Sequence, residues 1–486
     1  MQGPPIVIEI GVCSPSDCNS EEAYSYMTNY ANDIIKEMGL GDGFSVQVSL
    51  PYQADNSRLN LGAWVVIILT SIIVLFGCIG IFVEYVTLFD KPGSVPTMKK
   101  DERLSRLGLV FYSFSFRNNL EKLFTVDDRG DSNLKIINGI RVFSICWVIT
   151  GHVFMNLSGS PMTNLLTVLN ITEKWYFALV PGGFFAVDVF FYMSGFLTFY
   201  LLTQRLYPRR GIDNYPMIYF HRWYRLVIPS GFCMLISMYA FKYWGSGPRY
   251  SDSWNMGNCR KTWWANILFI NNLYPWEMMD MCMGWYWYLA NDFEFFLISP
   301  IIIFIYCKSR YLGYATLVLC LLTNYLFAMI VTAKYDFGIF VTLQDTEDVM
   351  HWLYFKPWAR FGPYGIGALI GWGYFEYKQS RASFRPNQHP TFNNSVWTKI
   401  FMSYKISSVV SFASFIIGLT ITSFLVFIQH DFYKSQLAEN PWDKFPCMLF
   451  NAFSRSGFVL GLSLIILPTF ENRLSWIKSL LSSDFM

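Results

Sequence analysis

Two ionisable residues, Arg141 and His152, lie eleven positions apart in an otherwise apolar segment. Eleven helical steps of 100° come to about 20° more than three full turns, so both side chains share one helix face. The rise between them is roughly 16 Å, which places Arg141 at one membrane edge and His152 inside the bilayer. Ionisable groups inside a span indicate a functional site by default. The alternative is that Arg141 extends its side chain to the membrane interface and that His152 is a hydrogen-bonded residue of the helix packing.

Other predicted spans carry charged residues at a similar depth. Counted from the outer ends of their spans, His152, Asp188, Asp292 and Arg455 each lie roughly 9–10 Å deep, and Glu294 lies just beneath them. Unpaired, each group would cost a few kcal/mol at that depth. We therefore expect them to neutralise one another around a polar cavity.

A neutral imidazole beside a carboxylate can make a hydroxyl group nucleophilic near neutral pH. We expect Asp188 or Asp292 to orient His152, which then takes a proton from an acceptor alcohol. The sequence contains no nucleophile-elbow, zinc-protease, P-loop or dinucleotide-binding motif. No zinc site is expected, because the other four histidines lie outside the predicted spans: His221, His351, His389 and His430.

A second group of charges gathers at the predicted cytosolic ends of the spans: Arg141, Arg209, Arg210, Arg222 and Arg225. Guanidinium groups suit phosphate because they offer a planar fork of donors and keep their charge. The alternative is that these arginines set the topology and contact anionic lipids, as most basic loops do.

Composition sets the class of the protein. Of 486 residues, 53% are hydrophobic, 19% aromatic and only 15% charged, which is not the composition of an ordinary soluble chain. Several apolar stretches reach the length that a bilayer demands. We predict an all-α, polytopic transmembrane helical bundle of about nine spans, near 62–86, 139–158, 181–203, 226–244, 285–306, 311–333, 360–377, 404–428 and 448–470.

The distribution of basic residues orients the chain, since cytosolic loops carry an excess of Lys and Arg. It predicts an exterior N-terminal segment (1–60), a first transmembrane helix (61–87), a cytosolic linker (88–138), a transmembrane core (139–470) and a cytosolic tail (471–486). The protein is then a multi-pass protein of the endoplasmic reticulum or plasma membrane, with its N-terminus outside.

Residues 1–12 contain no secretory signal, so either the first span inserts with its N-terminus outward or the true start lies upstream. Residues Glu21 to Met38 are predicted to form an amphipathic helix. The sequon at Asn170 lies on the outer side and should carry glycan, whereas that at Asn393 lies on the cytosolic side and should not.

Four cysteines fall on the predicted outer side, where disulfides persist: Cys13, Cys18, Cys259 and Cys282. Four cysteines allow three connectivities. The simplest is Cys13–Cys18 with Cys259–Cys282.

Several segments resemble one family in the same order along the chain. The segment 138–152 is similar to the Arg-x10-His signature of the acyltransferase-3 family, and 220–229 to its paired-arginine segment. Variant residues resemble the animal nose-resistant-to-fluoxetine branch of that family. The further matching segments are 13–18, 185–197, 287–296, 360–367 and 454–456.

The resemblance implies an integral-membrane O-acyltransferase with acyl-CoA as co-substrate on the cytosolic side and no permanently bound cofactor. The acceptor would bear a hydroxyl group (a lipid, sterol or glycan), membrane lipids would be partners, and no nucleic-acid partner is expected. His152 and Arg141 would correspond to the family's essential histidine and arginine, and Arg222 and Arg225 would help Arg141 to bind the donor. Further buried polar residues are Glu294, Arg360 and Arg455.

A different class of function fits the same residues. Charges near the midplane and Gly/Pro-interrupted spans, as at 180–185 and 361–367, also suit a lipid or small-molecule carrier. A catalytically inactive relative is a further alternative, because the family usually continues with C-terminal spans beyond the region equivalent to 470.

Overall fold

The computed structural model describes residues 20–37, 59–89, 105–125, 132–158, 171, 174–245, 258–339, 346–382, 392, 394–430 and 442–483. These residues form helices and no strand, which confirms the predicted all-α class. The chain divides into two compact units. The larger contains the described parts of Gly130–Leu226 and Lys261–Met486, and the smaller those of Ile8–Arg129 and Val227–Arg260.

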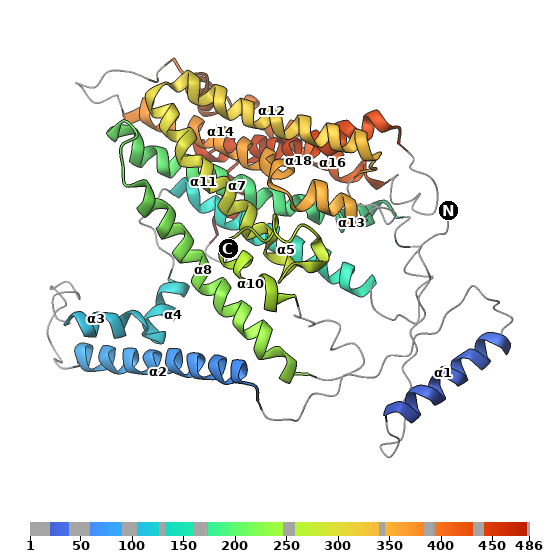
Figure 1. Cartoon of the computed structure of the whole chain (residues 1–486). Coiled ribbons are helices and arrows are strands. Elements are labelled where there is room, and N and C mark those ends of the chain that lie inside the picture. The colour runs from blue at the N-terminus through green and yellow to red at the C-terminus, as the bar shows by residue number, and fades with distance from the viewer. Residues whose placement is uncertain are drawn as a thin grey trace. The chain divides into compact units, whose positions relative to one another are not determined.

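The larger unit is a helical bundle (Figure 1). Its long helices are α5 (Ile136–Ser158), α7 (Gly183–Leu206), the first half of α8 (Tyr215–Tyr239), α11 (Trp287–Lys308), α12 (Arg310–Tyr335), α14 (Pro357–Ala382), α16 (Ser408–Phe427) and α18 (Lys444–Ile466). Shorter elements connect them: η2 (Ser132–Lys135), η3 (Trp175–Leu179), η4 (Tyr207–Arg209), α10 (Cys259–Ile267), η6 (Met278–Asp280), η7 (Gly284–Tyr286), α13 (Thr346–Val349), the π-helix η8 (Met350–Phe355), α15 (Val396–Ile406), η9 (Leu467–Glu471) and α19 (Ser475–Leu481).

Helices α7 and α14 form the centre of this bundle and share its most extensive contact. Glycines allow the close approach. A Cβ atom at Gly195 would lie 2.1 Å from the carbonyl oxygen of Tyr364, and one at Gly367 would lie 2.1 Å from that of Tyr192. A larger residue at either position would push the two backbones apart.

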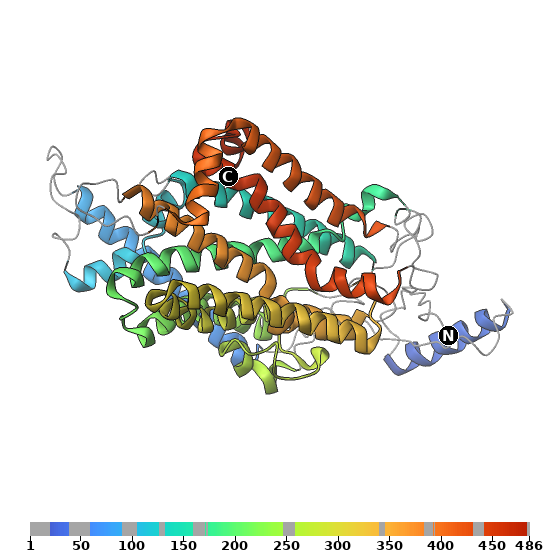
Figure 2. The same ribbon diagram turned by 90° about the horizontal axis from the view of Figure 1, so that it is seen from above.

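The remaining helices surround this pair. Helix α5 packs on α7, α11 contacts α7 and α12, and α12 contacts both α14 and α18. Helices α16 and α18 lie side by side, as Figures 1 and 2 show in orange and red. Charged residues on α7, α11, α14 and α18 are thereby enclosed among neighbouring helices.

The smaller unit contains α1 (Ser20–Glu37), which confirms the helix predicted near residues 21–38, and α2 (Leu61–Phe89). Helices α3 (Arg106–Ser113) and α4 (Phe116–Phe124) pack on α2. The hydroxyl of Ser115, the N-cap of α4, donates to the buried carboxylate of Glu84 on α2. The second half of α8 and η5 (Phe241–Tyr243) also belong to this unit.

Eight helices in the described part of the chain are long and apolar enough to cross a membrane. They coincide with eight of the nine predicted spans: Leu61–Val86, Ile136–Asn156, Trp175–Arg209, Tyr215–Tyr243, Gly284–Lys308, Arg310–Tyr335, Ser408–Phe427 and Lys444–Glu471. The ninth, 360–377, lies within α14, a helix of 26 residues. The mean hydropathy of α14 is lower than that of the other eight helices because it contains buried polar residues such as Arg360 and Glu376.

Candidate functional site

A basic cavity of about 660 Å³ lies in the larger unit, bounded by α5, α7, α8 and α11. Four guanidinium groups line it against one carboxylate. Successive turns of α8 provide Met217, His221 and Arg225 on one helix face. The charged and polar lining residues are Arg141, Ser194, Thr198, Arg205, His221, Arg222, Arg225, Tyr288 and Asp292.

Arg222 is held firmly in this cavity. Its Nη2 donates to Oδ2 of Asp292 at 2.6 Å and to the hydroxyl of Ser194 at 3.3 Å. Ser194 in turn donates to Oδ1 of Asp292, and the Arg222 guanidinium lies 4.3 Å from the ring centre of Phe296. Both carboxylate oxygens of Asp292 are therefore engaged, and the arginine fork keeps a defined orientation.

The other arginines are more accessible. Arg141 is exposed, and its Nη1 donates to Asn138 at 3.4 Å. Arg205 binds Asp213 through two hydrogen bonds of 2.6 and 3.1 Å. The hydrogen bond from Arg205 is the main reason why the pKa of Asp213 is lowered, so this carboxylate is charged at neutral pH.

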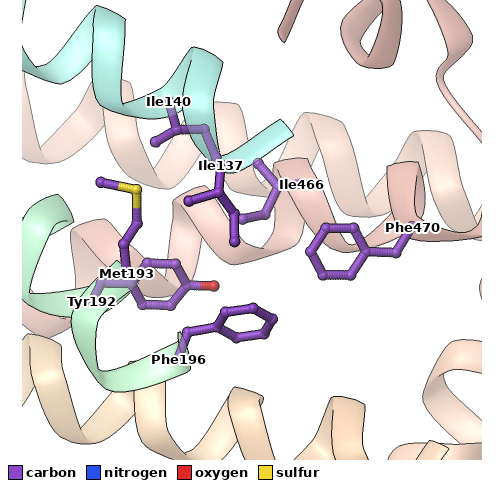
Figure 3. A pocket seen from close by; sticks show the side chains of 7 residues that line it. All are labelled: Ile137, Ile140, Tyr192, Met193, Phe196, Ile466 and Phe470. Carbon is purple, nitrogen blue, oxygen red and sulfur yellow. The ribbon is translucent and has the colours of Figure 1, made fainter. Parts of the chain in front are cut away.

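A small apolar crevice adjoins the basic cavity. Figure 3 shows its lining, contributed by α5, α7 and the end of the α18–η9 segment; the phenolic oxygen of Tyr192 is the only polar side-chain atom drawn. Met193 lines both hollows. The crevice contains no ionisable side chain of the kind needed for proton transfer near neutral pH, so the basic cavity is the better candidate site.

Asp188 lies elsewhere, in the middle of the bundle. Its Oδ1 accepts a hydrogen bond of 2.6 Å from Nη1 of Arg360, and both side chains are fully buried. Arg455 lies nearby and donates to the carbonyl oxygens of Leu353 and Ala359 at 2.6 and 3.2 Å.

Glu294 belongs to a third polar group. Its Oε2 accepts from the amide of Asn272 at 2.8 Å, and Nζ of Lys356 donates to the Asn272 carbonyl at 2.7 Å. Lys356 also lies 4.1 Å from the ring centre of Trp276. Burial lowers the pKa of Lys356 from 10.5 to about 8, although Glu277 and Glu294 act in the opposite direction.

The single charged layer that the sequence predicts is thus divided into separate groups. Asp292 joins Arg222, which had been assigned to the other end of the spans, and Asp188 joins Arg360. His152 is exposed on α5 and does not line the basic cavity. Among the described residues, both carboxylates are bound to other partners, so this geometry does not support them as the groups that orient His152.

Sequence reasoning missed Ser194, Arg205 and His221 as cavity residues. His221 was expected outside the spans, but α8 begins at Tyr215 and carries it on the cavity-lining face. The sequence did contain a signal for this: His221 is next to Arg222 and one helical turn before Arg225, so it could share their helix and their site.

Cys259 and Cys282 form a disulfide, which confirms that predicted pair. Cys13, Cys18, Asn170 and Asn393 lie outside the described residues.

Arg209 lies 3.2 Å from Asp213, whereas Arg210 has a left-handed backbone conformation at the end of η4.

The family described as an acyltransferase domain, the acyltransferase-3 family, matches residues 134–482. The chain belongs to this family. The match spans the helices that form both the basic cavity and the buried Asp188–Arg360 pair.

Two curated relatives from Caenorhabditis elegans are similar to this member of the acyltransferase-3 family. Nose resistant to fluoxetine protein 6 is 24% identical over 398 residues, which cover 75% of this chain and 47% of the relative. Regulator of hypoxia-inducible factor 1 is 24% identical over 294 residues, covering 54% of this chain and 55% of the relative. The chain thus spans about half the length of these relatives, and no solved structure matches it.

Proposed function

We propose that this protein is a membrane-embedded O-acyltransferase that takes its acyl group from acyl-CoA bound in the basic cavity. Family membership supports acyl transfer in general. The observation that carries the choice of donor is the presence of four guanidinium groups around a cavity of about 660 Å³, a volume suited to a small-molecule ligand.

The arginines would bind the phosphates of the donor. Arg222 supports this role best, because Asp292, Ser194 and Phe296 fix its side chain before any ligand arrives. Arg141 on α5 and Arg225, one turn after Arg222 on α8, would add positive charge, and the cavity would open to the cytosol. Membrane lipids would surround the exposed apolar faces of the spans.

The chemistry would require a base for the acceptor. In our proposal the imidazole of His152 takes the proton of an acceptor hydroxyl, whose oxygen attacks the thioester carbonyl. A C–O bond forms, the C–S bond breaks, and CoA leaves as the thiol after receiving a proton. His152 lies roughly 16 Å further along α5 than Arg141, so the extended pantetheine arm would have to cover that distance.

Thioester consumption by the purified full chain tests this function. Free thiol released from acyl-CoA should increase when a hydroxyl-bearing acceptor extract is added, and His152→Ala should abolish the increase. His430→Ala is the matched control, because the proposal gives His430 no part in the transfer and its replacement should leave release unchanged. Equal release from wild type and His152→Ala would remove His152 from the mechanism.

One observation favours a second candidate, a carrier or a catalytically inactive relative that binds a donor-like ligand. His152 does not line the basic cavity, so the structure does not bring the proposed base next to the proposed donor site. In the same assay, CoA binding without any thioester consumption would support this candidate and would contradict the enzyme.

A further inference from the structure

His221 lines the basic cavity but has no part in the acyl transfer proposed above. It is exposed on α8, one turn after Met217 and one turn before Arg225, and all three side chains line the cavity. Among the described residues that line the cavity, His221 is the only histidine. Histidine is the side chain whose charge ordinarily changes between about pH 5 and 8.

Charged or ionisable side chains face this cavity from each of the four helices that bound it. They are Arg141 on α5, Arg205 on α7, Arg222 and Arg225 on α8, and Tyr288 and Asp292 on α11. Arginine remains protonated in proteins, so the cavity holds a fixed positive charge. A proton on His221 would add to that charge.

Only part of this fixed charge is neutralised within the described part of the protein. Two guanidinium groups are paired with carboxylates at 2.6 Å: Arg222 with Asp292 and Arg205 with Asp213. Neither Arg141 nor Arg225 has such a pair among the described residues, so about two positive charges remain for a ligand.

The proposed donor carries more negative charge than these two arginines can neutralise. Acyl-CoA contains a diphosphate and a phosphate monoester, which together hold roughly three to four negative charges near neutral pH. Nearby negative charge favours the protonated form of an imidazole, and a protonated imidazole donates a hydrogen bond from each ring nitrogen. Phosphate oxygens accept such charge-assisted hydrogen bonds well.

We propose that His221 is a further phosphate-binding residue of the basic cavity and takes up a proton from solvent when the donor binds. This inference rests on the donor site proposed above. Binding and protonation are linked reciprocally, so each favours the other. Because the bound phosphates raise the proton affinity of His221, the affinity for the donor increases as the pH falls.

Titration of CoA into the purified full chain at pH 6.5 and at pH 8, at equal ionic strength, tests the proposal. Wild type should bind about five- to tenfold more tightly at pH 6.5. His221→Gln should lose this gain because the amide cannot be protonated. His221→Arg carries a fixed charge and should bind tightly at both pH values. His351→Gln on η8 is the control, and should keep the gain because the proposal gives His351 no part in binding.

Calorimetry measures the proton directly. At pH 7.5 the phosphates of CoA are almost fully ionised, so the dependence of the binding heat on the ionisation enthalpy of the buffer reports protons taken up by the protein. Wild type should take up about half a proton, and His221→Gln almost none.

Two results would overturn the proposal, and they differ in what else they contradict. If wild type and His221→Gln bind CoA with the same pH dependence and the same proton uptake, His221 is not linked to binding, although the donor site stands. If wild type does not bind CoA at either pH, the donor site itself is wrong.

Discussion

Arg222 on α8 and Asp292 on α11 are joined by a hydrogen-bonded ion pair of 2.6 Å at the wall of the basic cavity. The pair lies seventy positions apart in the chain and is completed by Ser194 on α7. Three helices thus meet through one arginine, and the orientation of its guanidinium depends on all of them.

Removing one partner of this pair should reveal the coupling between them. Asp292→Ala leaves Arg222 partly buried without its carboxylate, and Arg222→Gln leaves Asp292 unpaired. In a double-mutant cycle of unfolding free energies we expect a coupling of about 2 kcal/mol. Asp292→Ala combined with Arg225→Gln is the control pair, for which we expect additive effects. Additive effects for Asp292 and Arg222 would show that their contact contributes no stability.

In the proposed donor site, Asp213 would compete with the donor for Arg205. Because Arg205 lowers the pKa of Asp213, the carboxylate is charged at neutral pH and neutralises part of the cavity. Asp213→Asn should therefore tighten CoA binding by roughly two- to fivefold at low salt, with a smaller gain at high salt. The dissociation constant at two ionic strengths checks this, and weaker binding by the variant would contradict it.

Lys356 should make stability depend on pH. Burial lowers its pKa to about 8, so between about 8 and 10.5 the unfolded chain binds more protons than the folded one. The free energy of unfolding of the wild type, compared with that of Lys356→Met, should therefore increase as the pH rises across that window. Melting temperatures of the two proteins from pH 7 to 10 measure the difference, and Lys308→Met, an exposed lysine, is the control. Parallel curves would show that Lys356 is not desolvated.

Topology is tested by glycosylation. If the N-terminus is outside, Asn170→Gln should abolish the mobility shift that a glycosidase produces, and Asn393→Gln should leave it unchanged. Glycan at Asn393 would invert the predicted orientation, and the donor and acceptor sides would then exchange places.

Hydropathy predicted most of the spans. A helix that crosses a membrane must form all its backbone hydrogen bonds internally and must present apolar side chains to lipid or to neighbouring helices, so it appears in the sequence as a long apolar stretch. It did not predict which charges meet. Depth counted along each span assumes that all spans begin at one level, yet α8 begins at Tyr215 rather than near 226, which brings His221 and Arg222 into the helix.

Pairing across helices depends on which helices are neighbours, and periodicity within one helix carries no such information. The pair of Asp188 and Arg360 follows from the close packing of α7 on α14, which Gly195 and Gly367 allow. Arg360 stood out in the sequence only as a charge in an apolar segment. Lys356, one residue before α14, gave no signal of its fully buried position.

Binding of CoA to the purified full chain tests the central claim most directly. Titration at fixed low salt should give a dissociation constant that weakens about tenfold, or about 1.4 kcal/mol, in Arg222→Gln and in Arg225→Gln. Arg117→Gln on α4 changes an exposed arginine outside the cavity and should bind CoA as wild type does. If wild type does not bind CoA, or if all three variants bind it equally well, the basic cavity is not the donor site.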